Sequence, residues 1–436
     1  MAVTPDIAIH RARRSQLLET LGEGVLILAT APEALRNRDA HYPYRFDSHF
    51  YYLTAFPEPE AVLVLIAGKK PRQILFCREK NEEREIWDGF RFGPKAAKAS
   101  FGFDAAYPYD EIDRRLPKLL ENQSRLAYAF GSVPAWDARI MGWINAVRGK
   151  ARTGVTAPVN LTDVHALIDP QRLLKDAHEV ELMQRAAELS AQSHRAAMRL
   201  CKPGMGEGEL EAELMRVWRS GGCQAPAYAP IVAGGANACV LHYVANDQPL
   251  KEGDLVLIDA AGEYHGYAAD ITRTFPVNGR FSGVQSEVYA IVLAAQLAAI
   301  AAVRPGVDFN APHTAALRVL TQGLVDLKLL TGEVDGLIEK QAYKPWYMHK
   351  TSHWIGLDVH DVGDYKVAGA WRELQPGMTL TVEPGLYIRP ADNVPEALWN
   401  IGIRIEDDVL VTQAGCQVLT AAAPKTVAEI EAAMRP

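Results

Sequence analysis

Two aspartates, Asp259 and Asp270, flank a short segment that is typical of a hairpin loop. Strands are predicted over residues 254–259 and 267–275, and the two glycines within residues 262–266 suit a turn between them. The midpoint between the aspartates falls in this loop, so we expect the two side chains nearly opposite each other, within about 5 Å on one face of the sheet. Two buried carboxylates at that distance repel, and either a shared proton or a bound cation must neutralise them.

Two glutamates stand at the ends of other predicted strands. Glu383 directly follows the apolar run 379–382. Glu406 ends the alternating run 401–406, in which isoleucine occupies every second position, so the period of two places Arg404 and Glu406 on the face opposite the isoleucines. Acidic residues therefore recur where hydrophobic strands end.

One histidine, His353, completes a candidate metal site with these four carboxylates. If the carboxylates converge, their burial without a cation would cost several kcal/mol per charge, which favours a metal site. An oxygen-rich site with a single nitrogen ligand suits Mn²⁺ or a similar divalent ion better than a thiolate zinc site does. Four carboxylates are also enough to bridge two ions roughly 3.5–4 Å apart, the spacing at which two metals share a hydroxide nucleophile.

The elements that must position these residues change in type along the chain. Short apolar strands mixed with helical patterns from residue 24 to about 162 predict an α/β N-terminal domain. Asp176 and Glu179 form a capping-box pattern that opens a helix to about Arg199, and we place the domain boundary near residue 173. Beyond it, strands that follow one another through short turns predict an α+β domain with mainly antiparallel hairpins.

Composition excludes several classes of partner. The 436 residues are 48% apolar in type and carry a net charge of -7, so two or three domains are expected, and no basic surface is expected to recruit nucleic acid or anionic lipid. The N-terminus lacks a secretory signal pattern, and the longest apolar segment, 291–303, is too short to span a membrane and reads as a core helix. Five scattered cysteines without a CxxC pair favour buried thiols and a reduced, cytoplasmic setting.

Four motifs together resemble one family. The segments VLIDAAGEYHGYAADITRTFPV, HKTSHWIGLDVHDVG, TVEPGLYI and GIRIEDDVLVT resemble the creatinase/methionine-aminopeptidase "pita-bread" metallopeptidase superfamily, and within it the chain looks like the Xaa-Pro aminopeptidases, or aminopeptidase P. The likeness extends to NRDAHYPYRFDSHFYYLTAFPEPEAVLVL, which is similar to the N-terminal domain of that family. The resemblance implies an aminopeptidase-P-type domain over residues 1–173 and a pita-bread catalytic domain with a curved, mainly antiparallel sheet over residues 174–436.

The resemblance implies a role for each candidate ligand. Asp259 would chelate one ion, while Asp270 and Glu406 would bridge both. His353 and Glu383 would complete the coordination, and Glu383 would also handle a proton of the bridging water. The implied cofactors are two divalent ions, Mn²⁺ in the first place, with Zn²⁺ or Co²⁺ as alternatives. All five positions are filled by ligand types, which separates the chain from the creatinase branch, where the fold is shared without this metal site.

Five further residues match family positions that line the cleft. His242 and His360 are implied to donate hydrogen bonds to the scissile carbonyl and the developing oxyanion, the alternative being core histidines bonded to backbone. His349 and Arg404 are implied to shape a proline pocket, and pairing of Arg404 with a carboxylate behind the ligands is an equally plausible structural role. Tyr387 is assigned to the same pocket, with a packed strand aromatic as its alternative.

One residue departs from the family pattern. Lys350 stands inside the histidine-rich motif, where many relatives carry a small residue. This difference leaves the details of substrate binding open but does not affect the assignment of the metal ligands.

The implied reaction is hydrolysis of the first peptide bond of a peptide whose second residue is proline. The α-amino group would reach one metal, the other would polarise the scissile carbonyl, and the bridging hydroxide would attack. Because the imide nitrogen of an Xaa-Pro bond has no N–H, a dedicated pocket for the ring is expected. Proline-containing peptides are thus the expected partners, and the resemblance implies a homodimer or homotetramer in which the N-terminal domain caps the cleft and supplies subunit contacts.

Two other functions remain open from sequence. A prolidase has the same ligands and a similar N-terminal domain, but its pocket reads the terminal carboxylate of a dipeptide; the motif HWIGLDVHDVG favours the aminopeptidase. The second alternative is a non-catalytic binding protein on a pita-bread scaffold, against which the intact ligand set argues. Methionine aminopeptidase is disfavoured because a long segment precedes the catalytic region.

Overall fold

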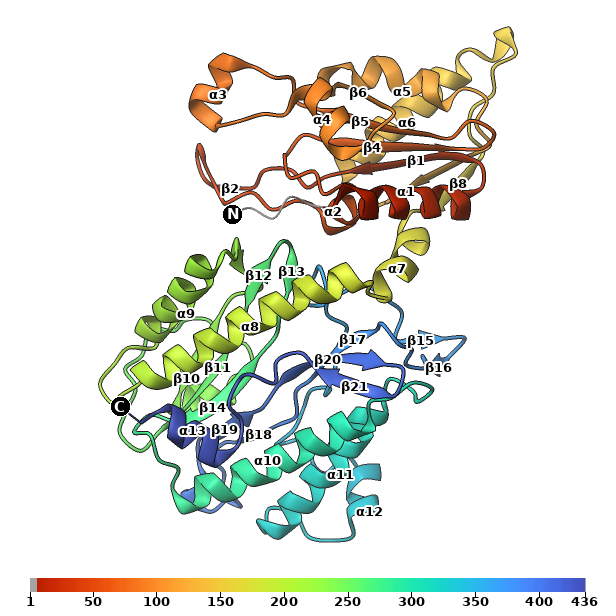
Figure 1. The fold of residues 1–436 in the computed structure, drawn as a ribbon. Helices are drawn as coiled ribbons and strands as arrows, with labels where there is room; N and C mark the ends of the chain where they lie inside the picture. The colour runs from red at the N-terminus through yellow and green to blue at the C-terminus, as the bar shows by residue number, and fades with distance from the viewer. Residues whose placement is uncertain (1–5, 436) are drawn as a thin grey trace. The chain divides into compact units, whose positions relative to one another are not determined.

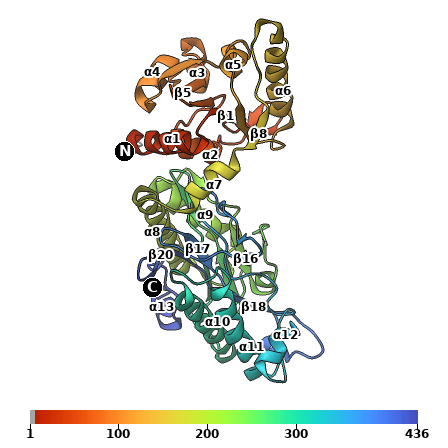
Figure 2. The same ribbon diagram turned by 90° about the vertical axis from the view of Figure 1, so that its right-hand side faces the viewer.

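The computed structural model describes residues 6–435, which form two compact units divided after Gln171. The sequence predicts a boundary near residue 173, two positions further on. Helix α7 (His165–Leu173) spans the division. Figures 1 and 2 show the elements of both units.

The first unit is built on one mixed sheet. Its elements are α1 (Ile7–Leu21), β1 (Gly24–Ala29), β2 (Leu35–Asn37), β3 (Ala40–His41), α2 (Ser48–Thr54), β4 (Val62–Ala67), β5 (Arg72–Cys77), α3 (Glu82–Asp88), α4 (Gly93–Phe101), β6 (Ala105–Pro108), the 3-10 helix η1 (Tyr109–Glu111), α5 (Ile112–Leu120), β7 (Arg125–Tyr128), α6 (Pro134–Arg148), η2 (Ala151–Thr153) and β8 (Asn160–Asp163). The strand order is β6-β5-β4-β1-β7-β8, with β1 antiparallel to β4 and parallel to β7.

Helices cover both faces of this sheet. Alternate residues of the central strands, such as Val25 and Val62, are completely buried in a cluster with the apolar faces of α5 and α6. Helix α1 lies on the opposite face (Figure 1) and buries Leu17 and Leu21. The predicted α/β domain is therefore confirmed, because helices shield both faces of a sheet whose central strands β1 and β4 are apolar along their whole length.

The second unit combines short antiparallel strands with two pairs of helices. Its elements are α8 (Ala177–Leu200), α9 (Glu207–Gly221), β9 (Ala225–Pro226), β10 (Ile231–Gly234), η3 (Gly235–Cys239), β11 (Leu255–Asp259), β12 (Gly262–Tyr264), β13 (Tyr267–Ala268), β14 (Thr272–Pro276), α10 (Gly283–Ala302), α11 (Ala311–Asp326), α12 (Val334–Glu339), β15 (Lys366–Val367), β16 (Ala370–Trp371), β17 (Thr379–Val382), β18 (Gly385–Ile388), η4 (Glu396–Leu398), β19 (Ile401–Arg404), β20 (Asp407–Thr412), β21 (Gly415–Val418) and α13 (Val427–Ala433). The strand pairs described here are antiparallel, as predicted.

Helix α8 begins as the sequence predicts. The N–H of Glu179 donates to Asp176 Oδ1 at 2.9 Å, and the N–H of Asp176 donates to the Glu179 carboxylate at 3.1 Å, which completes the capping box. Helices α8 and α9 pack together, as do α10 and α11, and strands such as β14, β18 and β19 are drawn between the two pairs (Figure 1).

Helix α10 is longer than the apolar segment seen in sequence. It begins after its N-cap Ser282 and is 20 residues long. Among the described residues, it is the one helix that is long and apolar enough to cross a membrane. The sequence argument that the segment is too short was therefore wrong. Its packing against α11 and the burial of residues such as Val292 and Gln296 nevertheless make it a core helix of this unit.

The hairpin that separates the two aspartates has a different register from the one expected. The turn residues are His265 and Gly266, with φ of 49° and 82°, which is the backbone of a type I′ turn. This turn lies later in the chain than the centre of the predicted loop, and the partner of Asp259 on β14 is therefore Thr272. Asp270, which we expected nearly opposite Asp259, precedes Thr272 by two residues and falls between β13 and β14, where the chain passes from one sheet to another.

The alternating run 401–406 is likewise followed directly by a second strand that lies in another sheet. Strand β19 pairs with β18, whereas β20 pairs with β17, and the chain changes sheet at Ile405 and Glu406. At Gly402 an added Cβ would lie 2.4 Å from the backbone oxygen of Ala238, so only glycine lets η3 approach β19 this closely.

Candidate metal centre

The residues predicted for catalysis gather at one cleft of the second unit. The cleft has a volume of about 550 Å³. Its lining includes all five predicted ligands together with four other predicted site residues: Asp259, Asp270, His353, Glu383, Glu406, His242, His349, His360 and Arg404. Tyr387 lies beside them and contacts two of them.

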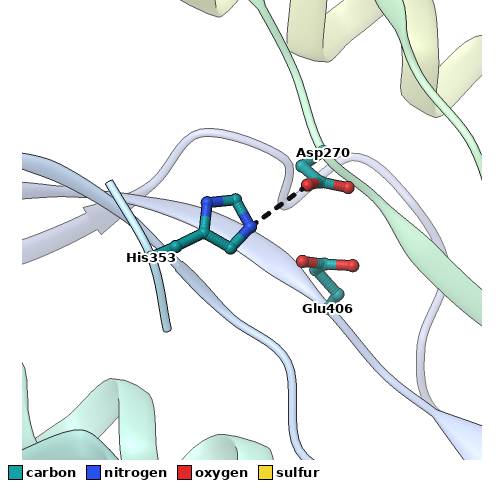
Figure 3. A group of neighbouring side chains, drawn as sticks. All are labelled: Asp270, His353 and Glu406. Carbon is teal, nitrogen blue, oxygen red and sulfur yellow. Dashed lines mark ion pairs between the residues drawn. The ribbon is translucent and has the colours of Figure 1, made fainter. Parts of the chain in front are cut away.

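Three of the predicted ligands form a compact group. Potential ligand atoms of Asp270, His353 and Glu406 lie within 4.8 Å of one another. Figure 3 shows the three side chains pointing toward one another, with the imidazole Nε2 of His353 3.5 Å from Asp270 Oδ2. Asp270 and Glu406 each occupy a link at which the chain changes sheet, so the breaks in the predicted strands are what direct both carboxylates inward.

Glu383 borders this group from the end of β17. Its carboxylate lies 3.7 Å from His353 Nε2, and its N–H donates to the carbonyl of Thr351 at 2.8 Å. The N–H of Thr381 on β17 donates to the carbonyl of His353 at 3.0 Å. Backbone pairing between β17 and residues 351–353 therefore fixes the spacing between the imidazole and the glutamate.

Asp259 is held by two neighbours instead of by the compact group. Arg404 Nη2 donates to Asp259 Oδ2 at 2.6 Å. The hydroxyl of Tyr228 lies 2.6 Å from Asp259 Oδ1 and 2.5 Å from Asp270 Oδ1, so it bridges the two aspartates. The side chains thus converge through Tyr228, although their strands are not in the expected register.

The electrostatics of the cluster call for a cation. Burial, followed by repulsion from Asp270 and Glu383, raises the pKa of Glu406 well above its usual range. Burial also raises the pKa of Asp270, and it raises that of Glu383 to about 7. Burial opposes charge on His353, but its hydrogen bond to Asp270 and the nearby Glu383 raise its pKa to about 9. Carboxylates that protonate this readily have too little positive charge around them, even with Arg404 and His353 nearby, and several oxygens beside one imidazole are a donor set that fits a divalent cation.

A buried shell of polar residues holds the ligands in place. Thr272 donates its hydroxyl to Glu406 Oε2 at 2.6 Å, and Asp408 accepts the N–H of Asp270 at 3.0 Å. Arg273, which is completely buried and paired with Asp407 at 2.7 Å, donates to the carbonyl of Glu406 at 2.5 Å. Such contacts orient ligands and set how basic they are.

A directed chain of hydrogen bonds joins the residues predicted to receive proline. Arg404 Nη1 donates to the Tyr387 hydroxyl oxygen at 2.9 Å, and that hydroxyl lies 2.8 Å from His349 Nε2. Burial and the nearby Arg404 lower the pKa of His349 to about 4, so its imidazole is neutral near pH 7. Tyr387 therefore donates to Nε2, and the proton on Nδ1 reaches the carbonyl of Lys350 at 2.8 Å.

The two remaining predicted histidines lie at the mouth of the cleft. His242 and His360 are exposed, and the ring of His360 lies 4.4 Å from that of His353 in an edge-on arrangement. Burial, then the nearby His353, lowers the pKa of His360. Their exposure rules out the alternative that they are core histidines.

Sequence reasoning missed part of the site. Tyr228 lies in a loop between prolines, far from the motifs, and nothing in its spacing connects it with the aspartates. Asp407 and Asp408 carried a usable signal, because two carboxylates next to Glu406 at the start of an apolar strand require partners.

Comparison with known proteins identifies both units. Residues 181–413 match the model for metallopeptidase family M24, and residues 10–128 match that for the aminopeptidase P N-terminal domain. The chain is 44% identical to the Xaa-Pro aminopeptidase of Escherichia coli, with coverage of 97% of this chain and 96% of the relative. It is 41% identical to the Haemophilus influenzae protein of the same name, over 99% and 98% of the two chains.

Solved structures agree with this likeness along the whole chain. Pseudomonas aeruginosa aminopeptidase PepP superposes with a TM-score of 0.98 at 51% identity, covering 99% of this chain and 98% of that one. Proline aminopeptidase P II from Yersinia pestis gives 0.96 at 44% identity, with 99% of each chain covered. A third neighbour, with a TM-score of 0.96, 42% identity and coverage of 99% and 98%, is a zinc-substituted Escherichia coli aminopeptidase P in complex with product. The pita-bread expectation is therefore confirmed, and the chain belongs to metallopeptidase family M24, among its Xaa-Pro aminopeptidases.

Proposed function

We propose that the chain releases the first residue of peptides whose second residue is proline, with two divalent cations bound in the cleft, Mn²⁺ in the first place. The proposed ligands are the five predicted from sequence: Asp259, Asp270, His353, Glu383 and Glu406. The observation that supports this most directly is the convergence of buried carboxylates with raised pKa values around one imidazole. Divalent cations held there would supply Lewis acidity at a carbonyl oxygen and lower the pKa of water.

We assign proton transfer to Glu383. Burial raises the pKa of its carboxylate to about 7, and a group that titrates near the working pH both accepts and returns a proton readily. In this scheme a carboxylate oxygen of Glu383 takes a proton from the attacking water and returns it to the proline nitrogen as the peptide bond breaks. His242 and His360, exposed at the cleft mouth, are assigned to donate hydrogen bonds to the scissile carbonyl oxygen.

We assign the proline ring to the surface formed by His349, Tyr387 and Arg404. Tyr387 is completely buried and holds His349 and Arg404 through its hydroxyl, and these two side chains line the cleft, where they can contact an apolar pyrrolidine. Because the Xaa-Pro nitrogen donates no hydrogen bond, shape at this position discriminates proline from other residues. The alternative is a prolidase with the same ligands, whose pocket would also bind the carboxylate of a dipeptide.

One comparison of substrates decides between these activities. Mn²⁺-loaded protein is given an Xaa-Pro dipeptide, an Xaa-Pro-Yaa tripeptide and a longer peptide, and release of the free first residue is measured. An Xaa-Ala-Yaa tripeptide is the control for proline selectivity. Faster cleavage of the longer peptides supports the aminopeptidase, whereas cleavage confined to the dipeptide supports the prolidase. If the protein binds metal but cleaves none of these peptides, the remaining alternative is a non-catalytic binding protein.

We also propose a homodimer or homotetramer with contacts from the N-terminal unit. Helix α3 and the loop after it expose large apolar side chains, with Ile86 82% and Trp87 80% accessible and Phe90 66% accessible. A cluster of this kind favours burial against another protein surface. Sedimentation at micromolar concentration tests this: a monomer for the native chain, or an unchanged assembly for Ile86→Glu with Trp87→Glu, would contradict it.

We propose a cytoplasmic setting on the basis of the thiols. All five cysteines are free, and three of them, Cys77, Cys223 and Cys239, are buried. Burial raises the pKa of the Cys77 thiol to about 12, so it has little tendency to form the reactive thiolate. Fractionation of the source cells tests the proposal, and recovery of the protein outside the cytoplasm would contradict it.

A further inference from the structure

A second pocket adjoins the catalytic cleft at Lys350, the residue that departs from the family pattern. This lysine–tryptophan pocket has a volume of about 470 Å³, and the residues that define it are Phe309, Lys350, Ser352, Tyr365, Lys366 and Trp371. Lys350 and Ser352 line the catalytic cleft as well, so the two spaces share one rim. The volume is within the range of small-ligand sites, roughly 300–1,000 Å³.

Aromatic rings form the wall of the pocket. Phe309 contacts Tyr365 with ring centroids 4.8 Å apart, and the centroid of Trp371 lies 6.3 Å from that of Phe309. Phe309 is buried, whereas Tyr365 and Trp371 are half-buried. Rings that are packed on one side and accessible on the other offer a fixed apolar surface to a side chain, and aromatic pairs gain stability beyond the area that they bury.

The charge at the pocket is positive. The ammonium groups of Lys366 and Lys350 lie 4.5 Å and 5.9 Å from the centroid of the Trp371 ring. No acidic side chain lines the pocket, and in the described part of the chain neither lysine has a carboxylate within 4.0 Å. Two ammonium groups beside one aromatic ring therefore suit a ligand in which an anionic group is attached to an apolar one.

The residues 351–352 at the base of the lysine–tryptophan pocket are held firmly and include one hydroxyl donor without a partner in the part of the chain that is described. Thr351 is completely buried, and its hydroxyl contacts His313 at 2.9 Å and Tyr347 at 2.6 Å. Burial, then Lys350, lowers the pKa of His313 to about 4, so the lysines alone give the pocket its charge. Ser352 is 8% exposed, and its hydroxyl has no hydrogen-bond partner among the residues that the structure describes. A buried hydroxyl without a partner, shared by two adjoining pockets, is placed to bond a chain that passes between them.

We propose that the lysine–tryptophan pocket binds the third residue of the substrate, and that it favours tripeptides with an apolar or aromatic third side chain and a free terminal carboxylate. This rests on the proposed function, because the proline surface ends at His349 and the next residue of a bound peptide passes Lys350. The third side chain packs on Trp371 and Phe309. Its carboxylate accepts hydrogen bonds from Lys350, and Ser352 donates to the peptide backbone.

The test compares three substrates of the metal-loaded, full-length enzyme: Ala-Pro-Phe, its C-terminal amide and Ala-Pro-Gly. The native enzyme is expected to favour Phe over Gly at the third position and the acid over the amide, each by about fivefold or more in kcat/KM, the size of a single exposed charge or ring contact. Lys350→Ala removes the preference for the acid, and Trp371→Ala removes the preference for Phe. Lys344→Ala, which replaces an exposed lysine outside both pockets, is the matched control and keeps both ratios.

The outcomes separate this inference from the proposed function. Cleavage of all three peptides with ratios near one, or ratios unchanged in both variants, overturns the third-residue site and leaves the aminopeptidase intact. If no Xaa-Pro peptide is cleaved, the proposed function fails, and calorimetric titration with the dipeptide Pro-Phe still tests the pocket. Several-fold weaker binding of Pro-Phe by Lys350→Ala than by Lys344→Ala supports it; equal binding by the two variants overturns it.

Discussion

Arg404 Nη2 lies 2.6 Å from Oδ2 of Asp259, and the same guanidinium reaches the hydroxyl of Tyr387 at 2.9 Å through Nη1. Its Nε also donates to the hydroxyl of Thr272 at 3.1 Å. One buried side chain thus joins a proposed metal ligand, the proposed proline surface and a residue that holds Glu406. The expected pairing of Arg404 with a carboxylate is therefore present, but the carboxylate is Asp259, a proposed ligand, and not a residue behind the ligands.

Replacement of Arg404 by lysine is expected to lower kcat/KM for an Xaa-Pro-Yaa peptide by about 10- to 100-fold, the usual cost of losing a residue that orients ligands. Lysine keeps the charge but cannot reach three partners with a planar fork. Steady-state kinetics at saturating Mn²⁺ measure the loss. Arg318→Lys, in the exposed pair of Arg318 with Asp335, is the control. Activity of Arg404→Lys within twofold of the native value would contradict the role.

Glu406→Gln is expected to abolish turnover and to remove much of the bound metal. The amide keeps the shape of the side chain but removes a charge from the cluster that the cations are proposed to neutralise. Metal content after desalting, measured by mass spectrometry, and turnover of a tripeptide are the readouts. Glu396→Gln, at an exposed position of η4, is the matched control. Full turnover by Glu406→Gln would refute the five-ligand assignment.

Tyr228→Phe is expected to widen the gap in melting temperature between metal-loaded and chelated protein. In the chelated state the Tyr228 hydroxyl bonds Asp259 and Asp270, and its loss leaves buried carboxylate oxygens without a donor, at a cost of about 1–3 kcal/mol. Bound cations neutralise the same oxygens, so the loaded state loses less. Melting curves with Mn²⁺ and with EDTA measure the gap, and a gap equal to that of the native protein would contradict the prediction.

Much of this architecture was readable in the sequence because local patterns determined it. The capping box at Asp176 and the apolar alternation of β17 each depend on residues close together in the chain. The register of Asp259 was not readable, because it depends on which two residues of a glycine-containing loop take positive φ. The switch of sheet at Glu406 depends on which strands lie nearby, which no local pattern encodes.

The five candidate ligands, which the structure brings to one cleft, were nevertheless identifiable from the four motifs, whereas the residues that contact them from behind were not. Tyr228 reaches the aspartates only through the folded loop. Arg273 looks like an ordinary strand residue in sequence, yet it is completely buried and bonds both Asp407 and the carbonyl of Glu406. These contacts link residues that are 31 to 134 positions apart, and their partners became identifiable only from the fold.

The pair of Arg273 and Asp407 also makes stability depend on pH. Burial opposes ionisation of Asp407, but Arg273 and Lys425 together lower its pKa from 3.8 to about 2. The folded chain therefore binds a proton at this carboxylate less readily than the unfolded chain. The contribution to stability is present above pH 3.8 and is lost as the pH falls toward 2, and it amounts to about 2 kcal/mol.

Asp407→Asn is expected to lower the free energy of unfolding by about 3–5 kcal/mol at pH 6, because it leaves buried Arg273 without its counter-charge. The difference between native and variant is expected to shrink as the pH falls from 5 toward 2.5, since protonated Asp407 and asparagine are then both neutral. Urea unfolding across this range measures the difference, and Asp392→Asn, at an exposed loop position, is the control. A difference that stays constant from pH 5 to 2.5 would show that the charge of Asp407 does not stabilise the fold, and that Arg273 is held by its backbone carbonyl acceptors instead.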